Sequence, residues 1–194
     1  MTAAAEPTSV RRLDTPGATE LAGLAAVFED LQYALRCCEH LVTQLGRRDP
    51  DPVLVEALWT AALLAYARCF SARRAGLTAA DLDGLEDGAE FGELHAALLK
   101  LRDHLASRHV NPRETFTIGA AQANDGTPTG IAVVSSTHPQ VEEASVRLFG
   151  RLAYLLAGRV DARMQQRQRA VLDEAAALSP GRLAKLPLVH LTPG

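Results

Sequence analysis

The sequence predicts a mainly α-helical protein: a four-helix bundle with a short extra helix and one inserted antiparallel β-hairpin. Three observations support this fold class. Apolar residues recur at steps of three and four over most of the chain, as on one face of a helix. Aromatic residues make up only 5% of the chain, so the core must consist mainly of Leu, Val and Ala. Between residues 115 and 136 the pattern changes to that of two strands.

The bulk composition is that of one soluble globular domain. The chain has 194 residues, of which 47% are hydrophobic and 22% charged. The net charge of -3 lacks the basic excess of a protein that coats DNA. No uninterrupted apolar run reaches the ~18 residues of a membrane span, and residues 1–12 contain no apolar signal segment. We therefore expect a cytoplasmic protein with no membrane contact.

The cysteines predict no metal or cofactor. Cys37, Cys38 and Cys69 are odd in number and match no zinc-binding spacing. Adjacent cysteines on a helix cannot readily bridge each other or share a tetrahedral metal ion. We expect small buried or half-buried thiols.

The first half of the chain contains recognisable helix starts. Residues 1–14 are polar and carry no period, which predicts a disordered arm. Thr15-Pro16 combines an N-cap with proline at the first helical position, and the long helix that follows should end at Gly46. Asp51-Pro52 repeats this signal for a second helix. Thr78 with Asp81 forms a capping-box variant, which predicts a short helix that closes at Gly84.

The second half should hold two further helices around the hairpin. The third helix should run from about Glu90 to His109, and the longest helix from about Gln140 to Leu178. We expect residues 15–178 to form one domain, with the hairpin at about 115–136. The polar distal part of the longest helix should project beyond the core. The tail at 179–194 is apolar for a terminus, and part of it should dock on another segment.

One group of residues on the third helix has side chains that could act in catalysis. His95, Arg102 and His109 are spaced by seven, and at ~100° per residue they lie along one line of the helix. RNA cleavage without a metal needs a group that titrates near neutral pH and a permanent cation beside the phosphate. Histidine and arginine fit these two roles. The spacing therefore makes Arg102 and His109 candidate catalytic residues.

A structural interpretation of the same residues stays open. Arg102 could be a rim residue paired with a carboxylate such as Glu39 or Asp30. His109 could be a cation favoured by the dipole at the C-terminal end of its helix. Arg68 lies at the end of the second helix, where it could bind phosphate or simply cap a solvated helix end.

The run at 101–111, with the preceding helix at 59–77, resembles bacterial helix-bundle proteins of the HEPN superfamily. In that superfamily an Arg, four to six residues and a His end a helix, and Arg102-x6-His109 fits at the upper limit. Many members carry Arg-Asp-Lys-His-Ile-Ala-His-Ser-Val-Asn at this place. The present chain keeps Arg102, Asp103, Val110 and Asn111, whereas Arg108 stands at the second His of that run.

This resemblance implies a four-helix core and a dimer that brings two such motifs together. It implies either a metal-independent ribonuclease, of toxin or phage-defence type, or a non-catalytic module that binds a protein or nucleotide. Under the first interpretation the supporting or RNA-binding residues would be His95, Asp103, Arg108, Asn111 and Arg68. A homodimer is also expected from the long last helix, the bare hairpin and the apolar tail, which together expose more apolar surface than a monomer usually does.

Overall fold

The protein is described here from a computed structural model. The structure describes residues 9–71, 76–85, 87–106, 116–135 and 141–189. The element bounds in chain order are α1 Pro16–Leu45, α2 Pro52–Cys69, the 3-10 helix η1 Ala79–Asp81, α3 Gly88–Ala106, β1 Phe116–Gln122, β2 Pro128–Ser135, α4 Glu143–Ala176 and α5 Pro180–Leu183. The mainly helical fold with one antiparallel hairpin is confirmed.

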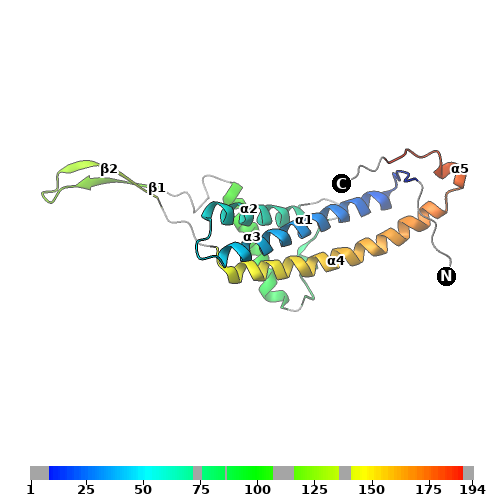
Figure 1. Ribbon diagram of the computed structural model, residues 1–194, viewed down its shortest axis with the longest axis horizontal. Coiled ribbons are helices and arrows are strands. Elements are labelled where there is room, and N and C mark those ends of the chain that lie inside the picture. The colour runs from blue at the N-terminus through cyan, green and yellow to red at the C-terminus, as the bar shows by residue number, and fades with distance from the viewer. Residues whose placement is uncertain (1–8, 72–75, 86, 107–115, 136–140, 190–194) are drawn as a thin grey trace.

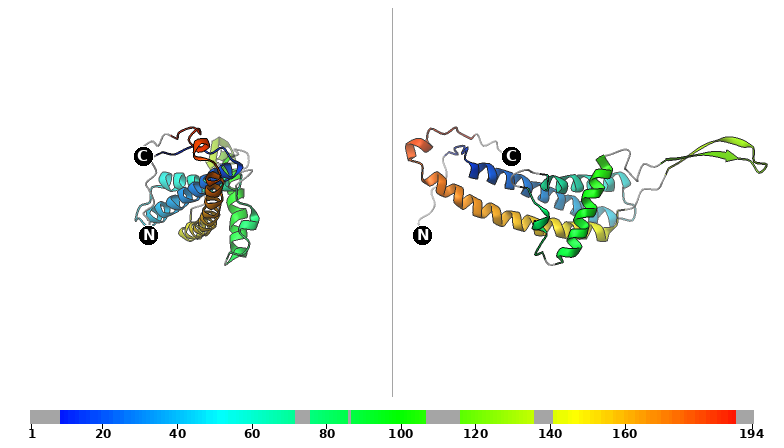
Figure 2. Two further views of the ribbon diagram at one scale, coloured as in Figure 1. Left: turned by 90° about the vertical axis from the view of Figure 1, so that its right-hand side faces the viewer. Right: turned by 180° about the vertical axis from the view of Figure 1, so that it is seen from behind.

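The helices form an elongated body, which we call the helical body (α1, α2, η1, α3 and α4). The long helices α1 and α4 run antiparallel side by side, α2 lies against α1, and α3 crosses the others steeply (Figures 1 and 2). The core between them consists mainly of aliphatic residues, joined by a cluster of edge-to-face aromatic contacts. Phe149 contacts both Trp59 and Tyr66, with ring centroids 5.8 and 5.2 Å apart.

The predicted helix starts are confirmed by their cap geometry. The Thr15 side chain accepts a hydrogen bond from the Ala18 N–H, and Asp51 accepts from two backbone N–H groups of α2. Thr78 and Asp81 form the predicted capping box at η1. Helix α2 ends at Cys69, where the returning chain bonds Leu77 N–H to the Cys69 carbonyl at 2.8 Å.

Two expectations about the chain ends need correction or extension. The disordered arm is wrong for residues 9–14, because Arg11 pairs with Leu188 in an antiparallel bridge. The Arg12 N–H donates to the Pro187 carbonyl at 2.9 Å, and Val189 N–H donates to the Val10 carbonyl at the same distance. The apolar tail therefore docks on the N-terminal segment, which satisfies the backbone of both. Residues 1–8 lie outside the described part.

The distal part of α4 extends beyond the hydrophobic core, whose buried residues on this helix end at Val160, but it is not isolated. Helix α1 extends alongside it, and Arg167 donates to Glu20 at 2.7 Å. Arg163 pairs with Asp81, and Val171 is buried against α1 near Gly17. Polar partners on α1 and η1, which are remote in sequence, hold this stretch to the rest of the helical body.

The hairpin projects away from one end of the helical body (Figure 1). Its strands pair in antiparallel register from Phe116–Ser135 to Gln122–Pro128. The turn is closed by Ala123 and Thr127, with Gly126 at φ +86° and the Asp125 carboxylate accepting from Thr127 N–H at 2.9 Å. None of the described hairpin residues is buried.

Candidate functional site

The candidate site lies at the end of α3, and Arg102 is its best described residue. Its Nε and Nη2 both donate to one oxygen of Asp103, at 2.9 and 2.6 Å. The Arg102 side chain is 34% exposed and that of Asp103 is 65% exposed. With respect to the described residues, two donors on one solvated oxygen leave the Nη1 edge of the guanidinium for another acceptor. Arg102 thus has a carboxylate partner on its own helix, and neither Glu39 nor Asp30 fills that role.

The other half of the candidate pair cannot be placed. His109, Arg108 and Asn111 lie outside the described residues, so the structure says nothing about their distance from Arg102. The described part of α3 ends at Ala106, and the side chains of its last three residues are not described. Of the two candidate residues, Arg102 alone has a described environment.

His95 lies on the same helix but faces the interior. Its Nδ1 shares a 2.9 Å hydrogen bond with the Tyr66 hydroxyl. Its ring packs against Phe70, with centroids 4.4 Å apart, and more distantly against Tyr66. Burial lowers the pKa of His95 below its ordinary value, because the charged ring would lose water. His95 therefore holds α3 to α2 and satisfies the buried Tyr66 hydroxyl, which is a structural role.

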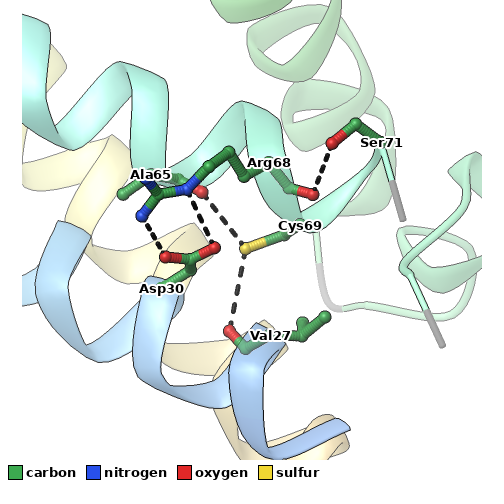
Figure 3. A network of polar contacts seen from close by, with 6 residues as sticks. All are labelled: Val27, Asp30, Ala65, Arg68, Cys69 and Ser71. Atoms are coloured by element: carbon green, nitrogen blue, oxygen red, sulfur yellow. Dashed lines mark hydrogen bonds and ion pairs between the residues drawn. The ribbon is translucent and has the colours of Figure 1, made fainter. Parts of the chain in front are cut away.

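Arg68 is also engaged within the protein. Its guanidinium bonds both oxygens of Asp30, joining α2 to α1 (Figure 3). The hydrogen bond to Asp30 raises the pKa of Arg68 further, so the guanidinium stays charged. The Arg68 side chain is 63% exposed, yet its charge is balanced. Asp30, one of the carboxylates considered for Arg102, is held by Arg68 instead.

The thiol of Cys69 lies beneath this ion pair. It contacts the carbonyls of Ala65 and Val27 at 3.4 and 3.7 Å (Figure 3). Burial raises the pKa of Cys38 and that of Cys69 to about 12 each. A thiol of this kind is neither a nucleophile nor a metal ligand at neutral pH. Within the described ranges, no three His, Cys, Asp or Glu residues group as a metal site would require.

An arginine ladder on α4 was not predicted from the sequence. Arg159, Arg163 and Arg167 are spaced by four and line one face of the helix. Arg159 donates to the carbonyls of Asp81 and Asp83 at 2.6 and 2.9 Å. The four-residue spacing could have signalled this ladder, but its partners are remote in sequence.

A polar pocket of about 370 Å³ lies beside the ladder, between Glu20, Gly76, Gln166 and two of the arginines. Among the described residues that line the pocket, no cation is free for a phosphate, because Arg163 pairs with Asp81 and Arg167 with Glu20. The ladder therefore clamps η1 and α1 to α4.

Comparison with protein-family models, with curated proteins and with solved structures finds no match for this chain. Helix α2 is long and apolar enough to cross a membrane by length and composition alone, with a mean hydropathy of 1.3. The same property is common in core helices of soluble proteins, and eight α2 residues are buried against the rest of the body.

Proposed function

We propose that the protein is a metal-independent ribonuclease of toxin or phage-defence type, with Arg102 and His109 as its catalytic pair. The observation that supports this proposal is the state of Arg102. Its guanidinium is partly exposed and held by an exposed neighbour, so donors remain for a phosphate. An arginine fully paired with a buried carboxylate would have none left.

The proposed reaction follows from these two side chains. His109 accepts the proton of an RNA 2′-hydroxyl, and the 2′ oxygen attacks the adjacent phosphorus. The bond from phosphorus to the 5′ oxygen breaks, and that oxygen takes up a proton. Arg102 stabilises the negative charge that builds on the non-bridging oxygens. The products are a 2′,3′-cyclic phosphate and a 5′-hydroxyl. In the dimer that the resemblance implies, two such pairs would face each other.

The test is cleavage of RNA in EDTA by the purified protein. His109→Ala should reduce the rate by ~10²–10⁴, as loss of a general acid or base commonly does. Arg102→Lys should also lose most activity, because lysine keeps the charge but not the fork of donors. His40→Ala and Arg169→Ala, at exposed positions on α1 and α4, are matched controls that should cleave like wild type.

Each other outcome of this assay has a clear meaning. Equal cleavage by wild type and His109→Ala would show that a contaminating nuclease is responsible. Absence of cleavage by the wild-type protein on every RNA tested would contradict the catalytic proposal.

A second candidate is a non-catalytic helical module that binds a protein or nucleotide. The observation that favours it is that two of the residues expected to support catalysis have structural partners: His95 bonds Tyr66, and Arg68 bonds Asp30. Under this proposal the wild-type chain binds RNA, nucleotide or a protein partner without cleaving RNA. Binding that Arg102→Ala weakens, with no product in EDTA, would select it.

A further inference from the structure

The register of the hairpin gives it two unlike faces. Residues paired across the strands share a face, and the face alternates along each strand. One face carries the large side chains and is called here the apolar hairpin face: Phe116, Ile118, Ala120, Ile131 and Val133. The opposite face carries smaller side chains, namely Thr117, Gly119, Ala121, Gly130, Ala132 and Val134. The two faces of the hairpin thus differ in the size of their side chains rather than in their polarity.

The apolar hairpin face is uncovered. Its four large side chains are between 62% and 72% exposed. Within the described part of the chain, the hairpin lies beyond the end of the helical body, and no helix covers either of its faces (Figures 1 and 2). A two-stranded hairpin by itself is marginally stable in water, and stability requires further strands or a packed face. This face therefore needs an occupant.

The hairpin is also free of charge along both strands. Asp125, in the turn, is the one charged residue from 115 to 137. Exposed strands usually carry charged residues that prevent pairing with other chains. The helical body, in contrast, carries acidic and basic residues over much of its surface. The absence of charge favours a contact in which like residues meet.

A contact around a two-fold axis is easiest to form between patches that carry no charge. It brings the same patch of both subunits together, so a charged group close to the axis would lie beside the same charge of the partner subunit. An uncharged apolar face meets its own copy without such repulsion. A strongly charged partner surface would leave its own charges desolvated against these side chains.

The remaining apolar features of the chain have partners within the chain. The sequence predicted a homodimer from the long last helix, the tail and the hairpin. Helix α4 lies along α1, and the tail pairs with residues 10–12. Of the three, the hairpin alone packs on no other described element.

We propose that the apolar hairpin face packs against the same face of the hairpin of a second copy. Two hairpins stacked in this way form a two-layered, four-stranded unit with the sheets ~10 Å apart, the usual spacing of packed sheets. The strands are seven and eight residues long, about 23–26 Å. The two stacked hairpins have the same length because they belong to identical chains. The occupant is a second copy of this chain, and the contact is independent of the catalytic residues.

Charge substitutions test the contact through the oligomeric state. The wild-type chain should sediment as a dimer at micromolar concentration. Ile118→Asp should raise the Kd of the dimer at least tenfold, because each interface would hold two uncompensated carboxylates. Thr117→Asp places the same charge on the opposite face and should leave the dimer intact. Both variants should keep wild-type helical content, since the hairpin does not pack on the helices. A wild-type monomer, or equal effects of the two variants, would overturn the proposal.

Cross-linking distinguishes which surface of the second copy is involved. Ile118→Cys or Val133→Cys should give a covalent dimer with a short bis-maleimide, whereas Thr117→Cys should not. The wild type is the background control, since its three cysteines are buried and should not react. A dimer that Ile118→Asp dissociates but neither cysteine variant cross-links would place the hairpin on the partner's helices, and would overturn the hairpin-to-hairpin contact.

Discussion

The helical body and the projecting hairpin differ in what stabilises them. In the body, α1 and α4 bury at least eight residues each, and three arginines of α4 bind partners on η1 and α1. The hairpin buries none of its described residues and relies on one ladder of backbone hydrogen bonds and a tight turn. The packing partners of the body lie within the chain, whereas the described hairpin residues have none there, and we propose that a second copy supplies them.

The largest expected difference is between two apolar truncations. Phe149 is fully buried and contacts both Trp59 and Tyr66, so Phe149→Ala should lower the free energy of unfolding by about 3–5 kcal/mol. Ile131 is 72% exposed, and Ile131→Ala should change the stability of the dilute protein by less than about 0.5 kcal/mol. Urea unfolding followed by circular dichroism measures both. Similar losses for the two variants would contradict the comparison.

A smaller effect is expected at the polar clamp of the body. Asp81 is buried, accepts a hydrogen bond from Thr78 N–H at 2.7 Å and pairs with Arg163. Asp81→Ala should cost about 2 kcal/mol, because it removes a cap and leaves these donors without their carboxylate. Asp83→Ala, at the exposed neighbouring position, should be close to neutral and serves as the control. Thermal unfolding in parallel compares them.

Asp81 also gives the body a defined acid sensitivity. Burial acts to raise the pKa of Asp81, but the hydrogen bonds from Thr78 and Arg163 outweigh it, so the pKa lies below the ordinary value of 3.8. A depressed carboxyl pKa stabilises the folded state above the unfolded pKa, and this stability is lost as the pH falls through the folded pKa. Stability of the wild type should therefore fall below about pH 4. Asp81→Asn should lose less over the same range.

The smallest expected effect is the contribution of His95 to the change of stability with pH near neutrality. Its pKa lies below the ordinary 6.5 because burial penalises the charged ring. The unfolded state then binds the proton more readily, so stability is present above pH 6.5 and declines as the pH falls toward the folded pKa. His95→Gln should flatten the change between pH 7.5 and 5.5, while His40→Ala, at an exposed position, should retain it. An unchanged slope in His95→Gln would show that His95 is not the group responsible.

The sequence was most informative about features that depend on residues close to one another in the chain. The caps at Thr15, Asp51 and Thr78 each involve a side chain and backbone groups two or three residues away, so their spacing predicted them. The period of apolar residues predicted the helices, and the change of period predicted the hairpin. These features are local, and they define the fold class.

Contacts between remote residues could not be predicted in this way. The bond of His95 to Tyr66 decides that this histidine is structural, yet nothing near His95 in sequence indicates it. Arg11 and Leu188, which turn the predicted disordered arm into an ordered segment, are separated by most of the chain. At the candidate site, the spacing placed His95 and Arg102 on one helix but did not show which of them faces the interior.

Hydrogen exchange at two protein concentrations tests the central claim most directly. If the hairpin is completed by a second copy, amides of β1 and β2 should exchange rapidly in dilute solution and become protected as the concentration rises. Amides in the middle of α1 and α4 should be equally protected at both concentrations, because their partners lie within the chain. Hairpin protection that does not depend on concentration, or that rises in parallel with that of α1 and α4, would contradict the account.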